Sequence, residues 1–296
     1  MGFKAGFVAV IGKPNVGKSS LVNALVGEKV SITSPKAQTT RNRIFGIKNT
    51  DDYQIVFVDT PGVQHTKTKL GEYMNKATDG ATADVDAIVI VLDALRVGQE
   101  DYAIIERFEK VKCPIFLVVN KIETTNFEKM YPILAKLNEY KFIKKFLTTS
   151  AVRKLNIDEL EDDLVECLPE SEPFYPTDQY TDKSLRFMCQ EIIREKALLF
   201  LQEEIPHGIA IDINIFTEEE NLITIDANIV TENERHKSII IGSKGAMLKQ
   251  IGTSARKDIE ELTGLKVMLE LFVKVKKHWK DDISALTDFG FSKKDL

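Results

Sequence analysis

The chain has 296 residues, of which 43% are hydrophobic and 29% are charged, and its formal net charge is −5. This composition is typical of a globular protein with room for two domains, and it excludes a disordered or fibrous chain. The longest apolar runs, near residues 90 and 116, have the length of strands, so the sequence also excludes a transmembrane helix, which needs ~20 residues.

The chain contains three cysteines and no CxxC pair, and its four histidines are scattered without ligand spacing. This pattern argues against a disulfide framework and against a zinc site. We therefore expect a soluble protein in a reducing compartment.

The first apolar run, GFVAVI, leads into GKPNVGKS and then into a segment with helical spacing that stops at Gly27. This order predicts a strand, a glycine-rich loop and a helix. In such a loop the backbone amides surround phosphates, the lysine reaches the β and γ phosphates, and the serine hydroxyl binds Mg²⁺. The expected nucleotide-binding residues are Gly12, Lys13, Pro14, Asn15, Val16, Gly17, Lys18, Ser19 and Ser20.

A polar stretch without periodicity, residues 31–47, follows the predicted helix. Within it, Thr40 is placed to offer Mg²⁺ a second hydroxyl when the γ-phosphate is present. We interpret the whole stretch as a switch loop that the triphosphate orders and that hydrolysis releases.

The next alternating segment, YQIVFVDTPG, predicts a buried strand that ends at Asp59. An acidic residue at this end of a parallel strand, beside the phosphate loop, holds Mg²⁺ through its water shell. The Gly62 amide is expected to sense the γ-phosphate, and Thr60 and Pro61 complete the turn. Taken alone, DTPG is a common turn, so its position along the chain decides the interpretation.

The residue after this turn is Val63, where Ras-type enzymes have a glutamine that orients the attacking water. An apolar side chain cannot orient water, and Gln64, one position later, is expected to point elsewhere. The expected nucleotide contacts include Val63, but the catalytic residues are predicted to be Lys18, Thr40 and Asn15.

Two more buried strands follow, and the second ends in NKIE. Asn120 is expected to hold neighbouring loops and meet guanine N7, while the stem of Lys121 lies across the base. The carboxylate of Glu123 can accept from guanine N1–H and the 2-amino group. After a further strand, Ser150 precedes Ala151, whose amide can donate to O6, so the set selects guanine over adenine.

Three prolines between residues 169 and 176 exclude a continuous helix and mark a linker. We expect a first domain at 1–172, the linker at 173–180 and a second domain at 181–296. Hydrophobic periodicity in the second domain predicts helix, strand, strand, helix, helix and strand.

The second domain contains a GxxG sequence, GSKG, between an apolar turn and a long helix. In the second topology of the KH fold, such a loop lets the phosphates of single-stranded RNA approach the backbone. Residues 201–234 contain nine Asp and Glu residues and no Lys or Arg. Residues 235–280 contain eleven Lys and Arg and four Asp and Glu, which gives this segment a net charge of +7. The expected RNA-binding residues, within a KH module at about 201–280, are Ile241, Gly242, Ser243, Lys244, Gly245 and Lys249. The alternative is a glycine-rich turn between two solvated helices.

The segments GKPNVGKSSLVNAL, ITSPKAQTTRNRI, DTPGV and IIIGSKGAMLKQIGTSARKDIE together resemble the Era family, bacterial GTPases with a C-terminal KH domain. The resemblance covers nearly the whole chain. It implies an α/β P-loop GTPase domain with a mostly parallel sheet, followed by an α+β type II KH domain. It also implies binding and hydrolysis of GTP with Mg²⁺, and K⁺ coordination through Asn15. In relatives the residue equivalent to Glu123 is usually Asp.

Further implications of the resemblance concern partners and location. It implies binding to the 3′ end of 16S ribosomal RNA and a role in maturation of the small ribosomal subunit. A monomer is expected in the cytoplasm, with peripheral association to the inner face of the cell membrane.

Two other functions stay open at this point. The chain could be a constitutive RNA-binding protein with a non-hydrolysing nucleotide domain, or an ATP-dependent enzyme. Intact Lys18, Ser19, Thr40 and Asp59 argue against a degenerate nucleotide domain.

Overall fold

The computed structural model describes residues 2–36, 38–62, 68–82 and 84–291. The first part of the chain forms a six-stranded sheet in the order β2-β3-β1-β4-β5-β6. Only β2 runs antiparallel to its neighbour, so the sheet is mostly parallel, as the sequence predicts. The strands are β1 (Lys4–Ile11), β2 (Ile44–Asn49), β3 (Tyr53–Asp59), β4 (Ala87–Asp93), β5 (Ile115–Asn120) and β6 (Lys145–Thr148).

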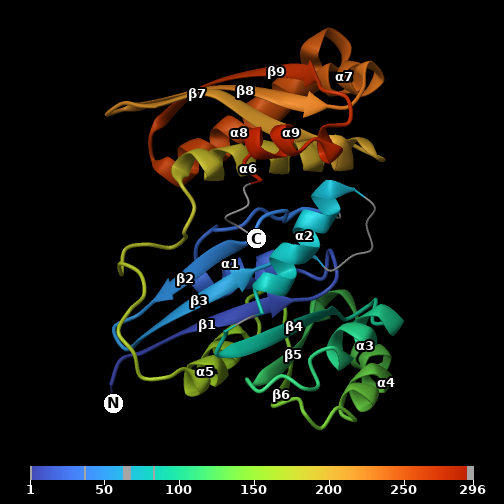
Figure 1. The fold of residues 1–296 in the computed structure, drawn as a ribbon, viewed down its shortest axis with the longest axis vertical. Coiled ribbons are helices and arrows are strands. Elements are labelled where there is room, and N and C mark those ends of the chain that lie inside the picture. Colours follow the sequence, from blue (N-terminus) through green and yellow to red (C-terminus); the bar gives the residue numbers. More distant parts are fainter. Residues whose placement is uncertain (1, 37, 63–67, 83, 292–296) are drawn as a thin grey trace.

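Helices cover both faces of this sheet (Figure 1). Helices α1 and α5 pack on one face through side chains such as Leu21 and Leu160, and α3 and α4 pack on the other through Ile105 and Leu137. The helices are α1 (Lys18–Val26), α2 (Lys69–Gly80), α3 (Gln99–Glu106), the 3₁₀ turn η1 (Ile122–Thr124), α4 (Phe127–Leu137) and α5 (Ile157–Cys167).

The parallel strands bring the predicted nucleotide segments to one edge. Strand β1 lies between β3 and β4, and the segments that follow β1, β3 and β5 carry the phosphate loop, the DTPG turn and NKIE. In open α/β sheets, ligands bind outside the carboxyl ends of the strands, where the strand order reverses.

The predicted switch loop is too long at its C-terminal end, because residues 44–47 belong to β2. Ile44 pairs with Asp59, and the ladder continues antiparallel along β3. The side chains of Ile44 and Ile47 are buried, and Gly46 lies against Val22 of α1. Pairing with β3 and cover from α1 therefore override the polar character of the preceding sequence.

The second part of the chain forms a three-stranded sheet in the order β7-β8-β9, with β7 antiparallel and β9 parallel to β8. Helices α6 and α8 cover one face, between this sheet and the first part of the chain (Figure 1). The predicted order of helix, strand, strand, helix, helix and strand is confirmed. The main elements are α6 (Leu185–Phe200), β7 (Ala210–Glu218), β8 (Leu222–Thr231), α7 (Glu234–Ile241), α8 (Ala246–Thr263) and β9 (Lys266–Val275). Shorter elements are η2 (Ile205–Gly208), η3 (Ser243–Gly245), η4 (Trp279–Asp281) and α9 (Ile283–Asp288).

The proline-rich segment between the two sheets contains no helix, and side chains of the first sheet fix its course. Gln54 accepts from the amides of Phe174 and Tyr175 at 2.7 and 3.0 Å and donates to the Tyr175 carbonyl at 2.8 Å. The Ile47 amide donates to the carbonyl of Tyr180. The segment is therefore docked along the sheet, while the domain boundaries at 172 and 181 stay a prediction.

The C-terminal segment packs back onto the first part of the chain. Leu70, Tyr73 and Met74 of α2 form one apolar cluster with residues that include Trp279 and Phe289. None of the helices in the described ranges is both long enough and apolar enough to cross a membrane.

Candidate functional site

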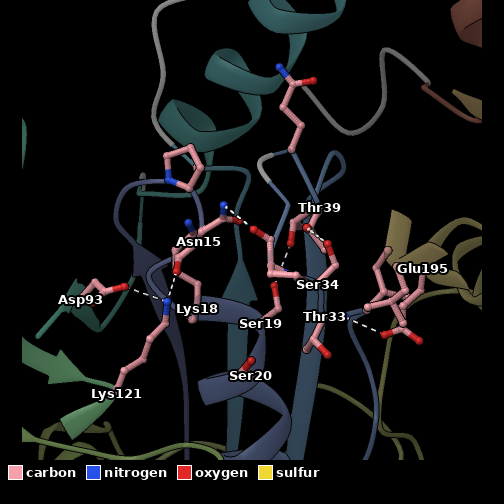
Figure 2. Close-up of a pocket in the computed structure, with 18 of the residues that line it drawn as sticks. Asn15, Lys18, Ser19, Ser20, Thr33, Ser34, Thr39, Asp93, Lys121 and Glu195 are labelled. Carbon is pink, nitrogen blue, oxygen red and sulfur yellow. Dashed lines mark hydrogen bonds and ion pairs between the residues drawn. The ribbon is translucent and has the colours of Figure 1, made fainter. Parts of the chain in front are cut away.

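A cavity of about 740 Å³ lies at the carboxyl edge of the first sheet, between the phosphate loop, the switch stretch and α6 (Figure 2). Residues from several separate predicted segments line it. The predicted site residues among them are Pro14, Asn15, Gly17, Lys18, Ser19, Ser20, Thr40, Gly62 and Lys121. The second domain adds Glu195, Lys196 and Leu199, which the sequence analysis did not assign to this site.

The phosphate loop depends on a glycine at position 17. Gly17 has a φ of 97°, and a Cβ there would lie 2.4 Å from Nδ2 of Asn120. A side chain would therefore be strained and would collide with the base-reading segment. The helix α1 begins directly after Gly17, so its free amides face the cavity, as phosphate binding at a helix N-terminus requires.

Lys18 curls over the loop and donates to the carbonyls of Gly12 and Lys13 at 3.0 and 2.9 Å. Its side chain is buried, and this burial lowers the pKa of Lys18 to about 8, although the nearby Asp59 carboxylate opposes the shift. Phosphate oxygens at the loop would restore the preference for the charged ammonium.

The three predicted magnesium ligands converge. The Ser19 and Thr40 hydroxyls lie 2.7 Å apart. Asp59 is fully buried, and neither carboxylate oxygen has a hydrogen-bond partner within the described ranges. Burial raises the pKa of Asp59, and the Ser19 hydroxyl and the Lys18 ammonium lie near enough to oppose part of this rise, although their geometry does not make a hydrogen bond to the carboxylate. Two hydroxyls and an unpartnered carboxylate suit Mg²⁺, which prefers oxygen ligands and keeps part of its water shell.

Asn120 ties the base-reading segments together. It donates to the Val16 carbonyl at 3.2 Å and accepts from the Thr149 hydroxyl and the Ala151 amide at 3.2 and 3.1 Å. The loop-holding role predicted for Asn120 matches this geometry. The Ala151 amide, which we expected at guanine O6, has Asn120 Oδ1 as its partner here.

Glu123 lies in the 3₁₀ turn η1 directly after the αL residue Lys121. Its Oε2 is buried and has no hydrogen-bond partner among the described residues. Because buried carboxylate oxygens are normally paired, this atom fits a ligand that brings its own donors. Ser150 is also buried, and its hydroxyl accepts from the Arg153 amide at 3.2 Å.

Some predicted site residues contribute backbone rather than side chain. The side chain of Val16 is buried in the core, and only its carbonyl faces Asn120. Thr60 is buried and donates to the carbonyl of Val10 at 2.8 Å, and Gly62 lies against Pro14. The predicted contact Val63 and its neighbour Gln64 lie outside the described residues.

Two carboxylates at this edge were missed by the sequence analysis. Asp93, at the end of β4, binds the Lys121 ammonium at 2.8 Å (Figure 2). Asp101 of α3 binds the Lys13 ammonium at 2.6 Å. Asp93 ends a buried strand beside the site, which is the same signal that identified Asp59, whereas nothing in the sequence pairs Asp101 with Lys13.

The second candidate site is the GxxG loop between α7 and α8. Gly242 has φ 72° and ψ 176°, a conformation that is essentially restricted to glycine, and a Cβ there would lie 2.8 Å from Cβ of Met247. Gly245 also has a positive φ and caps the N-terminus of α8. Ser243 and Lys244 are exposed at the tip, and Lys249 is exposed one turn into the helix.

A groove of about 680 Å³ runs from this loop between α8 and β9. Leu248 and Leu271 supply apolar lining, and Lys249 and Arg256 supply charge. The sequence analysis named Lys249 but missed the contribution of β9, because residues on an edge strand reveal their neighbour only in the fold. Such a groove suits stacked bases beside a phosphate-binding loop.

Comparison with protein families gives two matches. Residues 7–121 match a family described as 50S ribosome-binding GTPase, and residues 204–280 match the KH domain family. Among curated proteins, GTPase Era of Clostridium kluyveri is 47% identical over 290 residues, covering 97% of this chain and 99% of the relative. GTPase Era of Caldicellulosiruptor saccharolyticus is 45% identical and covers both chains completely.

Solved structures give the same result for the whole fold. A crystal structure of a point variant of Aquifex aeolicus Era bound to GDP·AlF4⁻ matches with a TM-score of 0.93 and 38% identity, covering 98% of this chain and 100% of the other. A crystal structure of Era in complex with MgGDPNP and nucleotides 1506–1542 of 16S ribosomal RNA has the same TM-score and identity, covering 98% and 99%.

Proposed function

The chain belongs to the Era family of GTPases, and from this premise we propose its function. GTP binding and hydrolysis control its affinity for the 3′ end of 16S ribosomal RNA. Its place of action would be the small ribosomal subunit during assembly. The observation that carries the proposal is that one chain holds both a cavity lined by predicted nucleotide-binding residues and a groove beside the GxxG loop. The guanine nucleotide cavity and the GxxG groove lie on two domains that pack together.

The chemistry at the first site is assigned residue by residue. Lys18 and the amides of the phosphate loop would bind the β and γ phosphates and stabilise the charge that develops during phosphoryl transfer. Mg²⁺, held by Ser19, Thr40 and the water shell near Asp59, would neutralise phosphate charge. Asn120, Lys121 and Glu123 would select guanine.

The RNA assignment draws support from the loop geometry and from a relative. Both ends of GSKG have positive φ angles, and the two residues between them are exposed. The related Era in complex with MgGDPNP was crystallised with nucleotides 1506–1542 of 16S ribosomal RNA. The net +7 of residues 235–280 matches a polyanionic partner.

Co-sedimentation with purified ribosomal subunits tests this function, with the chain loaded with a non-hydrolysable GTP analogue. We expect it to pellet with the small subunit and to be displaced by a single-stranded RNA of the 16S 3′ end. Preferential binding to the large subunit, which the description of the matched GTPase family names, would contradict the proposal.

Hydrolysis in this chain is further proposed to depend on K⁺ bound near Asn15. The side-chain nitrogen Nδ2 of Asn15 donates to the Pro35 carbonyl at 3.0 Å. The side-chain oxygen Oδ1 of Asn15 is therefore the atom that can coordinate a cation beside the phosphates. A monovalent cation there would neutralise transition-state charge, as an arginine finger does. Turnover should be faster in K⁺ than in Na⁺, and equal rates in both salts, unchanged by Asn15→Ala, would exclude the idea.

We also propose that the protein is a cytoplasmic monomer that associates peripherally with the inner face of the cell membrane. Family resemblance supports this part of the proposal. Flotation with anionic vesicles would detect the association, and sedimentation equilibrium would detect the mass of the 33.4 kDa chain. Absence of flotation at low salt would contradict the membrane association, and a dimer mass would contradict the monomer.

A further inference from the structure

Helix α6, the first helix of the second domain, packs against the switch stretch beside the nucleotide cavity (Figure 2). We propose that Arg194 of this helix is a positioning residue for GTP hydrolysis. Held by Glu191, it fixes the peptide that precedes Thr40, and it thereby keeps the Thr40 hydroxyl beside Ser19 where both can bind Mg²⁺.

Arg194 is itself fixed in one orientation. Its side chain is 3% exposed and forms a two-point contact with Glu191, with Nε donating to Oε1 at 2.7 Å and Nη2 donating to Oε2. Such a bidentate pair sets the direction of the guanidinium plane as well as its position. The remaining donors are therefore aimed rather than free to rotate.

Those donors meet the backbone of the switch stretch. Nη2 donates to the carbonyl of Thr39, and Nη1 donates to the carbonyl of Gln38 at 3.4 Å. Thr40 follows immediately, and its hydroxyl lies 2.7 Å from that of Ser19. Arg194 thus binds the carbonyls of the two residues that directly precede Thr40, a predicted magnesium ligand.

The neighbouring residue of α6 holds the other end of the stretch. Glu195 accepts from the Thr33 amide at 2.9 Å and from the Lys29 ammonium at 2.7 Å. Beyond Thr40, buried Arg41 donates to the carbonyl of Ile209 at 2.6 Å. The second domain therefore contacts the switch stretch on both sides of the predicted metal ligand Thr40.

This arrangement affects the triphosphate state most. Ordering a loop costs backbone entropy at each residue, and contacts made by another domain offset part of that cost. Thr40 is expected on Mg²⁺ only when the γ-phosphate is present. Loss of Arg194 should therefore lower kcat and raise the Mg²⁺ concentration needed for hydrolysis, while GDP affinity stays constant.

The test uses the full-length chain without RNA, so its outcome is separate from that of the RNA proposal. Variants Arg194→Ala, Arg194→Lys and Glu191→Gln are compared with Arg186→Ala. Arg186 is a matched control, because it lies on the same helix and also donates to a carbonyl, that of Ile213 inside the second domain. GDP-binding stoichiometry gives the folded, active fraction, and all rates are expressed per binding site.

We expect Arg194→Ala to reduce kcat about tenfold or more and to shift the Mg²⁺ dependence upward, with GDP affinity within about twofold of the parent. For Arg194→Lys and Glu191→Gln, we expect kcat values between those of Arg194→Ala and the parent. Arg186→Ala should have the parental kcat and Mg²⁺ dependence. A parental kcat and Mg²⁺ dependence in Arg194→Ala would overturn the proposal. If that variant does not fold, parental kinetics in Glu191→Gln would overturn it equally.

Discussion

At the scale of single residues, Glu123 is the carboxylate that we propose reads guanine, and the family resemblance implies Asp at this position. Glu carries one methylene more than this implied Asp, which moves the carboxylate by ~1.5 Å. The turn η1 and the αL conformation of Lys121 place Glu123 half-buried, with one oxygen unpaired within the described ranges. The longer side chain therefore still presents a buried acceptor.

We predict that the parent prefers GTP over ATP, and that Glu123→Asp binds GTP equally or more tightly. Glu123→Ala should lose most of the discrimination, because each hydrogen bond to a charged acceptor contributes about 1.5–3 kcal/mol. Competition binding with GTP, XTP and ATP measures this. XTP has an oxygen in place of the 2-amino group, so a parent that binds XTP as well as GTP would show that Glu123 does not read the base.

The Lys18 ammonium gives a pH dependence whose sign follows from its pKa of about 8 in the folded protein, below the usual 10.5. Without ligand it is charged below pH 8 and largely neutral above, whereas phosphate favours the charged form. Binding of GDP should therefore take up protons through this group, and the uptake should increase from pH 7.5 to pH 8.5. GDP affinity should accordingly weaken as pH rises through 8.

Calorimetry in buffers of different ionisation enthalpy measures this proton uptake. Burial raises the pKa of Asp59, and a bound metal would deprotonate this carboxyl group. Measurements without Mg²⁺ therefore separate the proton uptake of Lys18 from the proton release of Asp59. The same uptake at both pH values would show that the Lys18 ammonium is not the titrating partner of the phosphates.

At the scale of elements, the GxxG loop is predicted to carry RNA affinity. Ser243→Asp with Lys244→Asp places two carboxylates at the exposed tip, where phosphates must approach. We expect the affinity for single-stranded RNA of the 16S 3′ end to fall at least tenfold, with RNA-free GTP hydrolysis unchanged.

The matched control is Ser254→Asp with Lys257→Asp, which makes the same charge change on α8 but outside the groove. An equal loss of RNA affinity in both double variants would indicate general electrostatic attraction to α8 rather than a phosphate contact at the loop.

Elements with a strong local pattern were predictable, and elements defined by distant partners were not. Hydrophobic periodicity predicts β3 with Asp59 and the order of elements in the second domain. Glycine spacing predicts the phosphate loop, and the structure places glycines with positive φ there. Residues 44–47 looked like loop, because their strand character comes from pairing with β3 and from cover by α1. Asp101 and Arg194 reach the nucleotide site from other helices, and no spacing rule connects them to it.

At the scale of the whole molecule, the switch stretch and helix α2 both contact the second domain. Arg194 and Glu195 hold the stretch before Thr40, and α2, after the DTPG turn, packs on Trp279 and Phe289. Asp258 of α8, the helix that follows the GxxG loop, binds Lys29 at 3.3 Å and also binds Lys196. If the γ-phosphate and the RNA both favour this docked arrangement, nucleotide and RNA must each change the affinity for the other by the same factor.

The most direct test of this account is the affinity of the full-length chain for single-stranded RNA of the 16S 3′ end, measured in parallel with a non-hydrolysable GTP analogue and with GDP at the same salt concentration. We predict tighter binding with the GTP analogue, by about fivefold or more, which is the usual lower range for coupling between two sites. RNA affinity that is the same with either nucleotide would contradict the account, because the chain would then be a constitutive RNA-binding protein.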